Sequence, residues 1–158
     1  MTALGVTGHQ AIPPDMRAST VDAVRGVLRG AGSPLTGVTS LAAGADQLVA
    51  TELVRSGGRL HVIVPCRCYE RAFTTDEGLA RFRSLLEAAD EVTTLDYAEP
   101  SEEAFMAAGR TIVDSCEMLL AIWDGRPARG LGGTADVVDY ARSTGKAVSI
   151  VWPHGGGR

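Results

Sequence analysis

The stretch that decides the fold runs from residue 118 to residue 138 and reads MLLAIWDGRPARGLGGTADVV. It opens with an apolar run, 118–123, whose length is typical of a strand buried in a parallel sheet and too short for a membrane span. A glycine-rich loop follows, and apolar residues then return at helical spacing from Val137. Such a junction turns backbone N–H groups and the positive end of a helix dipole toward one point. It predicts either an anion-binding loop or a simple turn between strand and helix.

Two similar junctions lie earlier in the chain. The run ALGVT at 3–7 ends at Gly8 and His9, and the run GVTSLA at 37–42 ends just before Gly44 and Asp46. Each run is followed by a segment with apolar residues at helical spacing. In parallel sheets, ligands bind outside the carboxyl ends of the strands. We therefore expect the three loops to lie at one site.

The remaining pattern completes a regular alternation of strands and helices. Further strands are expected at 60–64, 91–95 and 147–152, and further helices begin near Thr75 and Ser101. The run at 91–95 is the most polar, which favours a sheet edge. The alternation predicts an α/β protein with a three-layer Rossmann-like fold, a mostly parallel sheet of about six strands with helices on both faces. One domain is expected over 1–153, with a flexible tail at 154–158.

Composition narrows the class of protein. With 45% hydrophobic and 22% charged residues, the chain is typical of a globular domain, and its net charge of −4 offers no basic stripe for a nucleic-acid duplex. The sequence contains neither a signal peptide nor a membrane-length apolar run, so we expect a cytoplasmic protein without a membrane partner. The three cysteines, two of them in Cys66-Arg67-Cys68, are interpreted as free thiols of a reducing compartment.

Several common motifs are absent from the sequence. There is no G-x-G-x-x-G dinucleotide fingerprint and no G-x-x-x-x-G-K-[ST] phosphate loop, which argues against a dehydrogenase or a kinase. The histidines at 9, 61 and 154 have no metal-ligand spacing, and no Ser-His-Asp or Cys-His order is identifiable. We expect neither a metal nor a cofactor.

Individual residues of the three loops carry the site hypothesis. His9 either contacts a ligand or is an ordinary polar residue, and Asp46 either caps a helix or contacts a ribose or base. Asp124 follows its strand without a helix directly behind it, so we expect it to accept hydrogen bonds from ribose hydroxyls. Arg110 either reaches a phosphate or is solvated. The expected ligand-binding set is Gly8, His9, Gly44, Asp46, Asp124, Gly130, Gly132, Gly133 and Thr134.

Taken together, these motifs resemble the SLOG superfamily, the Rossmann-like group named for the Smf/DprA and LOG proteins. The resemblance rests on GVTGHQ at 5–10, AAGADQL at 42–48, VIVPCRCYE at 62–70 and AGRTIVDSCEMLLAIWDGRPARGLGGTADVVDYA at 108–141. The likeness is greatest to small stand-alone members, which implies binding of nucleotides or nucleotide-derived signals. It also implies a homodimer or a higher homo-oligomer.

The LOG enzymes of that group release the base from a nucleoside 5′-monophosphate, and their motif is P-G-G-x-G-T-x-x-E with an upstream Arg. Here Gly130, Gly132, Gly133 and Thr134 keep the glycine and threonine character, although the order of the glycines differs, and Arg110 stands for the upstream Arg. The position of the catalytic Glu is Val137, and Asp136 comes one residue early, which on a helix turns a side chain by about 100°.

Three functions follow as hypotheses. The first is a binding or sensing module for a nucleoside monophosphate or an ADP-ribose-like ligand. The second is a LOG-like phosphoribohydrolase, an N-glycosidase, or related deoxyribosyl-transfer chemistry, with Arg110 and Asp136 as catalytic residues and Asp124 as the other candidate carboxylate. The third is an interaction scaffold with no ligand.

Overall fold

The computed structural model describes residues 2–127 and 132–152. Its strands form one six-stranded sheet in the order β4-β3-β2-β1-β5-β6, and every neighbouring pair is parallel. The strands are β1 (Thr2–Gly8), β2 (Leu35–Thr39), β3 (Arg59–Val64), β4 (Glu91–Thr94), β5 (Met118–Ile122) and β6 (Ala147–Val151). The predicted fold class is confirmed, as is the edge position of β4.

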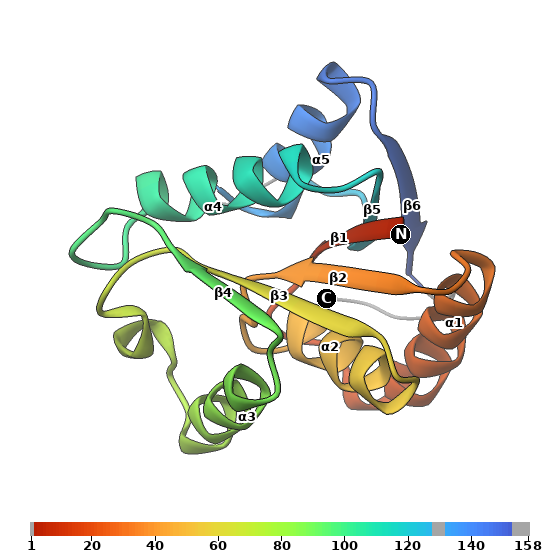
Figure 1. Cartoon of the computed structure of the whole chain (residues 1–158), viewed down its shortest axis with the longest axis horizontal. Helices are drawn as coiled ribbons and strands as arrows, with labels where there is room; N and C mark the ends of the chain where they lie inside the picture. Colours follow the sequence, from red (N-terminus) through yellow and green to blue (C-terminus); the bar gives the residue numbers. More distant parts are fainter. Residues whose placement is uncertain (1, 128–131, 153–158) are drawn as a thin grey trace.

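Helices cover both faces of the sheet. They are α1 (Arg17–Gly30), α2 (Ala45–Arg55), α3 (Asp76–Glu87), α4 (Glu102–Asp114) and α5 (Thr134–Ser143), with short 3-10 turns η1 (Pro14–Met16) and η2 (Tyr69–Ala72). In Figure 1, α4 and α5 form the layer above the sheet, and α1, α2 and α3 form the layer below it. The connection from β1 thus leaves on one face, whereas the connection from its neighbour β5 leaves on the other.

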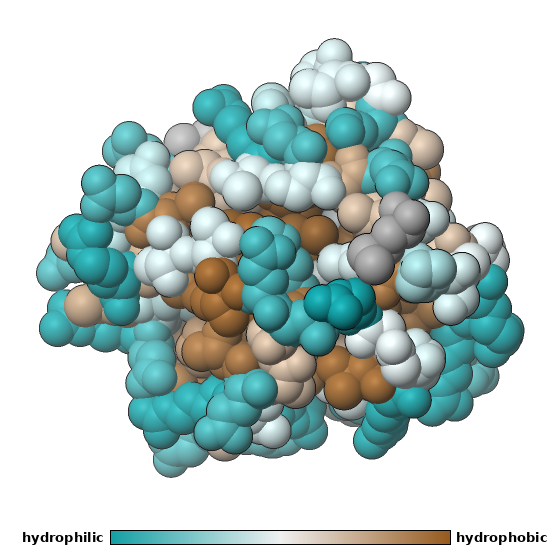
Figure 2. Space-filling model, in the orientation of Figure 1, coloured by the Kyte–Doolittle hydropathy of each residue, from teal (hydrophilic) through white to brown (hydrophobic). Residues whose placement is uncertain are grey.

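The apolar run of β5 explains why it is buried on both faces. Leu120 and Ile122 belong to the core between the sheet and α1 and α2, whereas Leu119 and Ala121 belong to the core between the sheet and α4 and α5. All four side chains are fully buried. Alternate residues of a strand point to opposite faces, so a continuous apolar run satisfies both. In Figure 2, hydrophilic side chains cover much of the outer surface of the helices, and hydrophobic ones gather between the two helical layers.

The helix starts follow the capping signals of the sequence. Ser101 accepts a hydrogen bond from the Ala104 N–H at 3.0 Å, and Thr75 accepts one from the Gly78 N–H at the same distance. A side-chain oxygen at this position satisfies an N–H group that has no partner within the helix. In the described part of the chain, no helix is both long and apolar enough to cross a bilayer.

The second strand differs from the prediction. We expected it at 37–42, but β2 spans Leu35–Thr39 and the chain then turns. Leu41 has a φ of 57°, a left-handed conformation that no strand can continue through, and its side chain is fully buried. Residues 40–44 therefore form a loop at the carboxyl end of β2, and Ser40, Ala42 and Ala43 of this loop line a cavity described below.

Candidate ligand site at the carboxyl edge of the sheet

A cavity of about 710 Å³ lies at the carboxyl edge of the sheet. Its walls come from the loops after β1, β2 and β3, from one face of α4, and from the first residues of α5. The cavity spans the gap between β1 and β5, where the connections diverge to opposite faces. Open α/β sheets bind ligands at such a crevice. We call this hollow the carboxyl-edge cavity.

Two of the predicted glycines allow the first two loops to touch. A Cβ at Gly8 would lie 2.5 Å from the Ala45 Cβ and 2.8 Å from the Ile122 carbonyl oxygen. Gly44 has a φ of 85°, and a Cβ there would collide with the backbone carbonyl of Gln10. The Ala45 N–H donates to the His9 carbonyl at 3.0 Å across the same contact. Because neither position has room for a Cβ, both glycines allow the close approach of α2 to the loop after β1. Gly8 also lines the cavity, whereas Gly44 does not.

His9 lines the cavity, and Asp124 holds it from behind. The His9 Nε2 lies 3.1 Å from the Asp124 Oδ1, and the imidazole packs edge-on against Trp152 at 5.2 Å between ring centroids. The Asp124 backbone N–H donates to the same Nε2 at 3.2 Å, so the backbone and the side chain of Asp124 both hold the imidazole. The Asp124 side chain is only 7% exposed and does not line the cavity, so its observed contacts position His9 and the turn after β5.

Asp46 reaches the cavity from the first turn of α2. Its Oδ2 accepts the Ala42 N–H at 3.2 Å, which ties the helix to the loop after β2, and no side chain caps the first turn of α2 itself. The residue is 7% exposed, and this burial raises the pKa of Asp46 to about 7. The raised pKa keeps the protonated form of the Asp46 carboxyl group accessible near neutral pH, and that form can donate as well as accept a hydrogen bond.

Ser40 is a site residue that sequence reasoning missed. It is 8% exposed and lines the cavity, and its Oγ is the one buried side-chain oxygen or nitrogen without a hydrogen-bond partner among residues 2–127 and 132–152. Leaving a buried hydroxyl unpaired costs about 1 to 3 kcal/mol. The signal was present, since a polar residue at the carboxyl end of a parallel strand faces the ligand edge, but the expected strand extended past it.

The start of α5 forms the third wall. Gly133 and Thr134 line the cavity, and no side chain caps the first turn of the helix. Gly132 has a φ of 86°, and a Cβ there would lie 2.8 Å from the Met106 backbone nitrogen, so the loop packs directly on α4. Gly130, also predicted to bind ligand, lies outside the described residues. The uncapped N–H groups and the helix dipole leave this wall suited to an anion.

The two residues predicted to be catalytic do not line the cavity. The Asp136 Oδ2 accepts the Gly132 N–H at 3.1 Å and so holds the loop before α5. Arg110 is exposed on α4, and its guanidinium lies 5.6 Å from the centroid of the Tyr140 ring. Its neighbour Gly109 faces the cavity, and the next position on a helix points about 100° away. The position of the LOG glutamate is Val137, whose aliphatic side chain lines the cavity.

An aromatic wall was not predicted from the sequence. Tyr69 and Phe73 come from the loop after β3 and meet at 5.2 Å between ring centroids, and Phe105 of α4 lies 6.5 Å from Tyr69. Tyr69 is 5% exposed, and this burial, aided by the charge of Asp46, raises the pKa of its hydroxyl. Phe73 and Phe105 are half-buried and line the cavity. Rings of this kind can stack on a flat base.

No metal centre is evident in the described parts of the chain. No three His, Cys, Asp or Glu side chains there gather as a metal ion requires. The cysteines at 66, 68 and 116 are free thiols.

Solved structures resemble the chain over nearly its whole length. DprA from Streptococcus pneumoniae superposes with a TM-score of 0.72 at 19% identity, over 97% of this chain and 51% of that protein. DprA from Helicobacter pylori, whose structure concerns its single-stranded DNA binding mode, gives 0.70 at 12% identity, over 97% and 66%. TM1055 gives 0.60 at 15% identity, over 94% and 72%. No protein-family model and no curated protein matches the sequence.

One expectation about partners needs correction. From the net charge of −4 we expected that a nucleic-acid duplex is not a partner. A protein of this fold, the Helicobacter pylori DprA, binds single-stranded DNA. Net charge is a property of the whole surface, whereas a single strand can be held by a local groove and aromatic rings. The charge therefore does not exclude a nucleic-acid partner.

The chain spans about half the length of the Streptococcus pneumoniae protein, so the likeness concerns one part of that molecule. At these identities the likeness establishes the fold, and it agrees with the motifs that suggested the resemblance. The chain has a Rossmann-like fold, which it shares with the DprA proteins and TM1055.

Proposed function

We propose that the chain binds a nucleotide or a nucleotide-derived ligand, a nucleoside monophosphate or an ADP-ribose-like molecule, in the carboxyl-edge cavity and acts as a binding or sensing module. The observation that carries the proposal is the buried, unpartnered Ser40 Oγ in a cavity of about 710 Å³. Drug-sized and cofactor-sized ligands occupy cavities of about 300 to 1,000 Å³. A bound ligand would supply the hydrogen bond that Ser40 lacks.

Three parts of the cavity lining suit the three parts of a nucleotide. The uncapped start of α5 at Gly133 and Thr134 offers N–H groups to a phosphate. Phe73 and Phe105 offer ring faces or edges to a base. Ser40, with the protonated form of Asp46, offers hydrogen bonds to sugar hydroxyls.

Binding without hydrolysis is favoured because the chain has Val137 at the position of the LOG glutamate. Asp136 is engaged by the Gly132 N–H, and Arg110 is exposed beside Tyr140. An N-glycosidase needs a carboxylate beside the anomeric carbon to stabilise an oxocarbenium-like centre and position water. Neither proposed catalytic residue lines the cavity.

The test combines a ligand panel with a serine variant. The protein is equilibrated with AMP, other nucleoside monophosphates, NAD, ADP-ribose and an oligothymidylate, and the retained and free fractions are separated by chromatography. We expect one small nucleotide to be retained intact. Free base in either fraction would establish an N-glycosidase instead, and an empty retained fraction across the panel would favour a scaffold.

The Ser40→Ala variant tests the geometry of the site. Its Oγ has no partner to lose, so we expect the free energy of unfolding to stay constant or rise by about 1 kcal/mol, while the retained ligand binds about 5-fold to 10-fold more weakly. Ser84→Ala, at an exposed position on α3, is the matched control and should change neither quantity. Undiminished affinity in Ser40→Ala would remove Ser40 from the site.

A further inference from the structure

A second cavity, of about 520 Å³, lies at the opposite edge of the sheet. It is bounded by the starts of β2 and β3 and by the ends of α1 and α2, and it shares no lining residue with the carboxyl-edge cavity. Gly32 and Gly57 form its turns with φ values of 85° and 84°, and a Cβ at either would meet nothing within 4 Å. The hollow is therefore open at the backbone of these turns.

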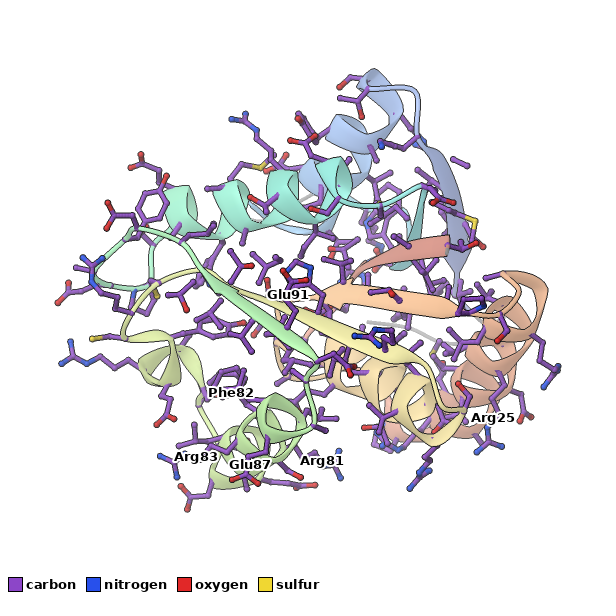
Figure 3. All side chains as sticks on the ribbon, viewed as in Figure 1. Arg25, Arg81, Phe82, Arg83, Glu87 and Glu91 are labelled. Atoms are coloured by element: carbon purple, nitrogen blue, oxygen red, sulfur yellow. The ribbon has the colours of Figure 1, made fainter. Side chains whose placement is uncertain are left out.

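Four arginines line this amino-edge cavity. Arg25 and Arg29 come from α1, Arg55 from the end of α2, and Arg59 from the first residue of β3. Figure 3 shows Arg25 in the lower helical layer, beside α1 and the end of α2. Because the whole chain has a net charge of −4, this gathering of positive charge runs against the composition of the protein.

One buried carboxylate orients two of these arginines. Glu52 is 7% exposed, its Oε1 accepts from the Arg25 Nε at 2.6 Å, and its Oε2 lies 3.3 Å from an Arg55 terminal nitrogen. A guanidinium has five N–H donors, so each keeps donors for a further partner. Within the described ranges, Arg29 and Arg59 make no ion pair at all.

Helix ends explain only part of this charge. Each helix carboxyl end bears the equivalent of about half a negative charge, and basic residues in a last turn offset it. Arg29 and Arg55 occupy the last turns of α1 and α2. After Glu52 and both helix ends are counted, the lining keeps a surplus of about two positive charges. Asp22 attracts Arg25 from α1 but does not line the cavity.

We infer that the amino-edge cavity is a second binding site, for a phosphate group. Guanidinium forks match phosphate oxygens with paired, charge-assisted hydrogen bonds, and Glu52 sets two of the forks beside each other. None of the described residues that line the cavity is aromatic, so it recognises the phosphate rather than a base. The phosphate can belong to a small free anion or to the backbone of a single-stranded nucleic acid.

The test uses the two arginines whose loss leaves Glu52 paired. Wild-type protein and the Arg29→Gln/Arg59→Gln variant are titrated with inorganic pyrophosphate and, separately, with an oligothymidylate at low salt. Arg17→Gln/Arg142→Gln is the matched control, because it removes the same charge at exposed positions without ion pairs that lie outside both cavities. Ser40→Ala marks binding at the carboxyl-edge cavity.

We expect saturable binding that weakens about 10-fold in Arg29→Gln/Arg59→Gln and changes by less than about twofold in the control. Loss in the pyrophosphate arm would identify a small free anion, and loss in the oligothymidylate arm alone would identify a nucleic-acid backbone. Equal affinity of the arginine variant and the wild type for both probes, or no saturable binding of either, would overturn the inference.

Discussion

The burial of Asp46 should make the free energy of unfolding depend on pH. Its folded-state pKa of about 7 lies above its ordinary value of 3.8, so the folded protein binds the proton more tightly than the unfolded chain does. The contribution of Asp46 to stability is therefore fully present below pH 4 and is lost as the pH rises toward 7. We expect this one residue to lower the free energy of unfolding by up to about 1.4 kcal/mol per pH unit in that window.

Urea unfolding of wild type and Asp46→Asn at several pH values between 4 and 8 isolates this contribution. The variant cannot ionise at this position but keeps an oxygen for the Ala42 N–H. The difference in free energy between the two proteins should therefore shift in favour of Asp46→Asn as the pH rises. A difference that is constant with pH would mean that the carboxyl group titrates normally.

A second prediction at the residue scale compares two glycines. Gly8→Ala places a methyl group against the Ala45 Cβ and the Ile122 carbonyl, and we expect a loss of about 2 kcal/mol or more in stability. Gly26→Ala, in the middle of α1 with only the tip of the Arg29 side chain at 4.0 Å, should raise stability by about 0.5 to 1 kcal/mol. Chemical denaturation of both variants measures the contrast, and equal effects would contradict the close approach of α2 to Gly8.

At the scale of the element, α4 depends on its first turn. Ser101 caps it, Glu102 and Glu103 favour the positive end of the dipole, and Phe105 then enters the cavity wall. Ser101→Ala should cost about 1 kcal/mol of stability, and Ser101→Asp should restore most of it. Denaturation midpoints of the two variants decide this, since a structurally irrelevant cap would leave both at the wild-type value.

The sequence predicted most strands and helices but not every strand end or helix orientation. Strands and helices follow local patterns, so the run in β5 and the helix starts near Thr75 and Ser101 were predictable. The end of β2 was not, because the left-handed backbone of Leu41 is stabilised by burial in the tertiary structure. The face on which Arg110 lies depends on the rotation of α4 against the sheet, which spacing from the strand does not define.

At the scale of the whole molecule, the reactivity of the three thiols reports how well the interior is shielded from solvent. Cys66 and Cys116 are at most 3% exposed, and burial raises the pKa of both thiols, whereas Cys68 is partly exposed. The thiolate is the reactive form, so buried thiols react slowly. Titration with a thiol-specific disulfide reagent should label Cys68 in the native protein and the other two only after unfolding. Labelling of all three without denaturant would indicate an open core.

The topology of the sheet also explains which site residues could be predicted. The three loops were identified because all strands are parallel and their carboxyl ends meet at one edge. The aromatic wall could not be identified in this way, since Tyr69 and Phe105 are brought together from separate elements only by the packing of α4 over the sheet. His9 was open between two interpretations, and the structure places it at the cavity with Asp124 behind it.

Helix α2 links the two ends of the molecule. Asp46 in its first turn reaches one cavity and Glu52 near its last turn reaches the other, six residues or about 9 Å along one rigid rod. A slide or tilt of this helix would change both cavities at once. If the ligands of the two cavities favour different positions of this helix, each alters the affinity of the other by the same factor, because thermodynamic coupling between two binding equilibria is reciprocal.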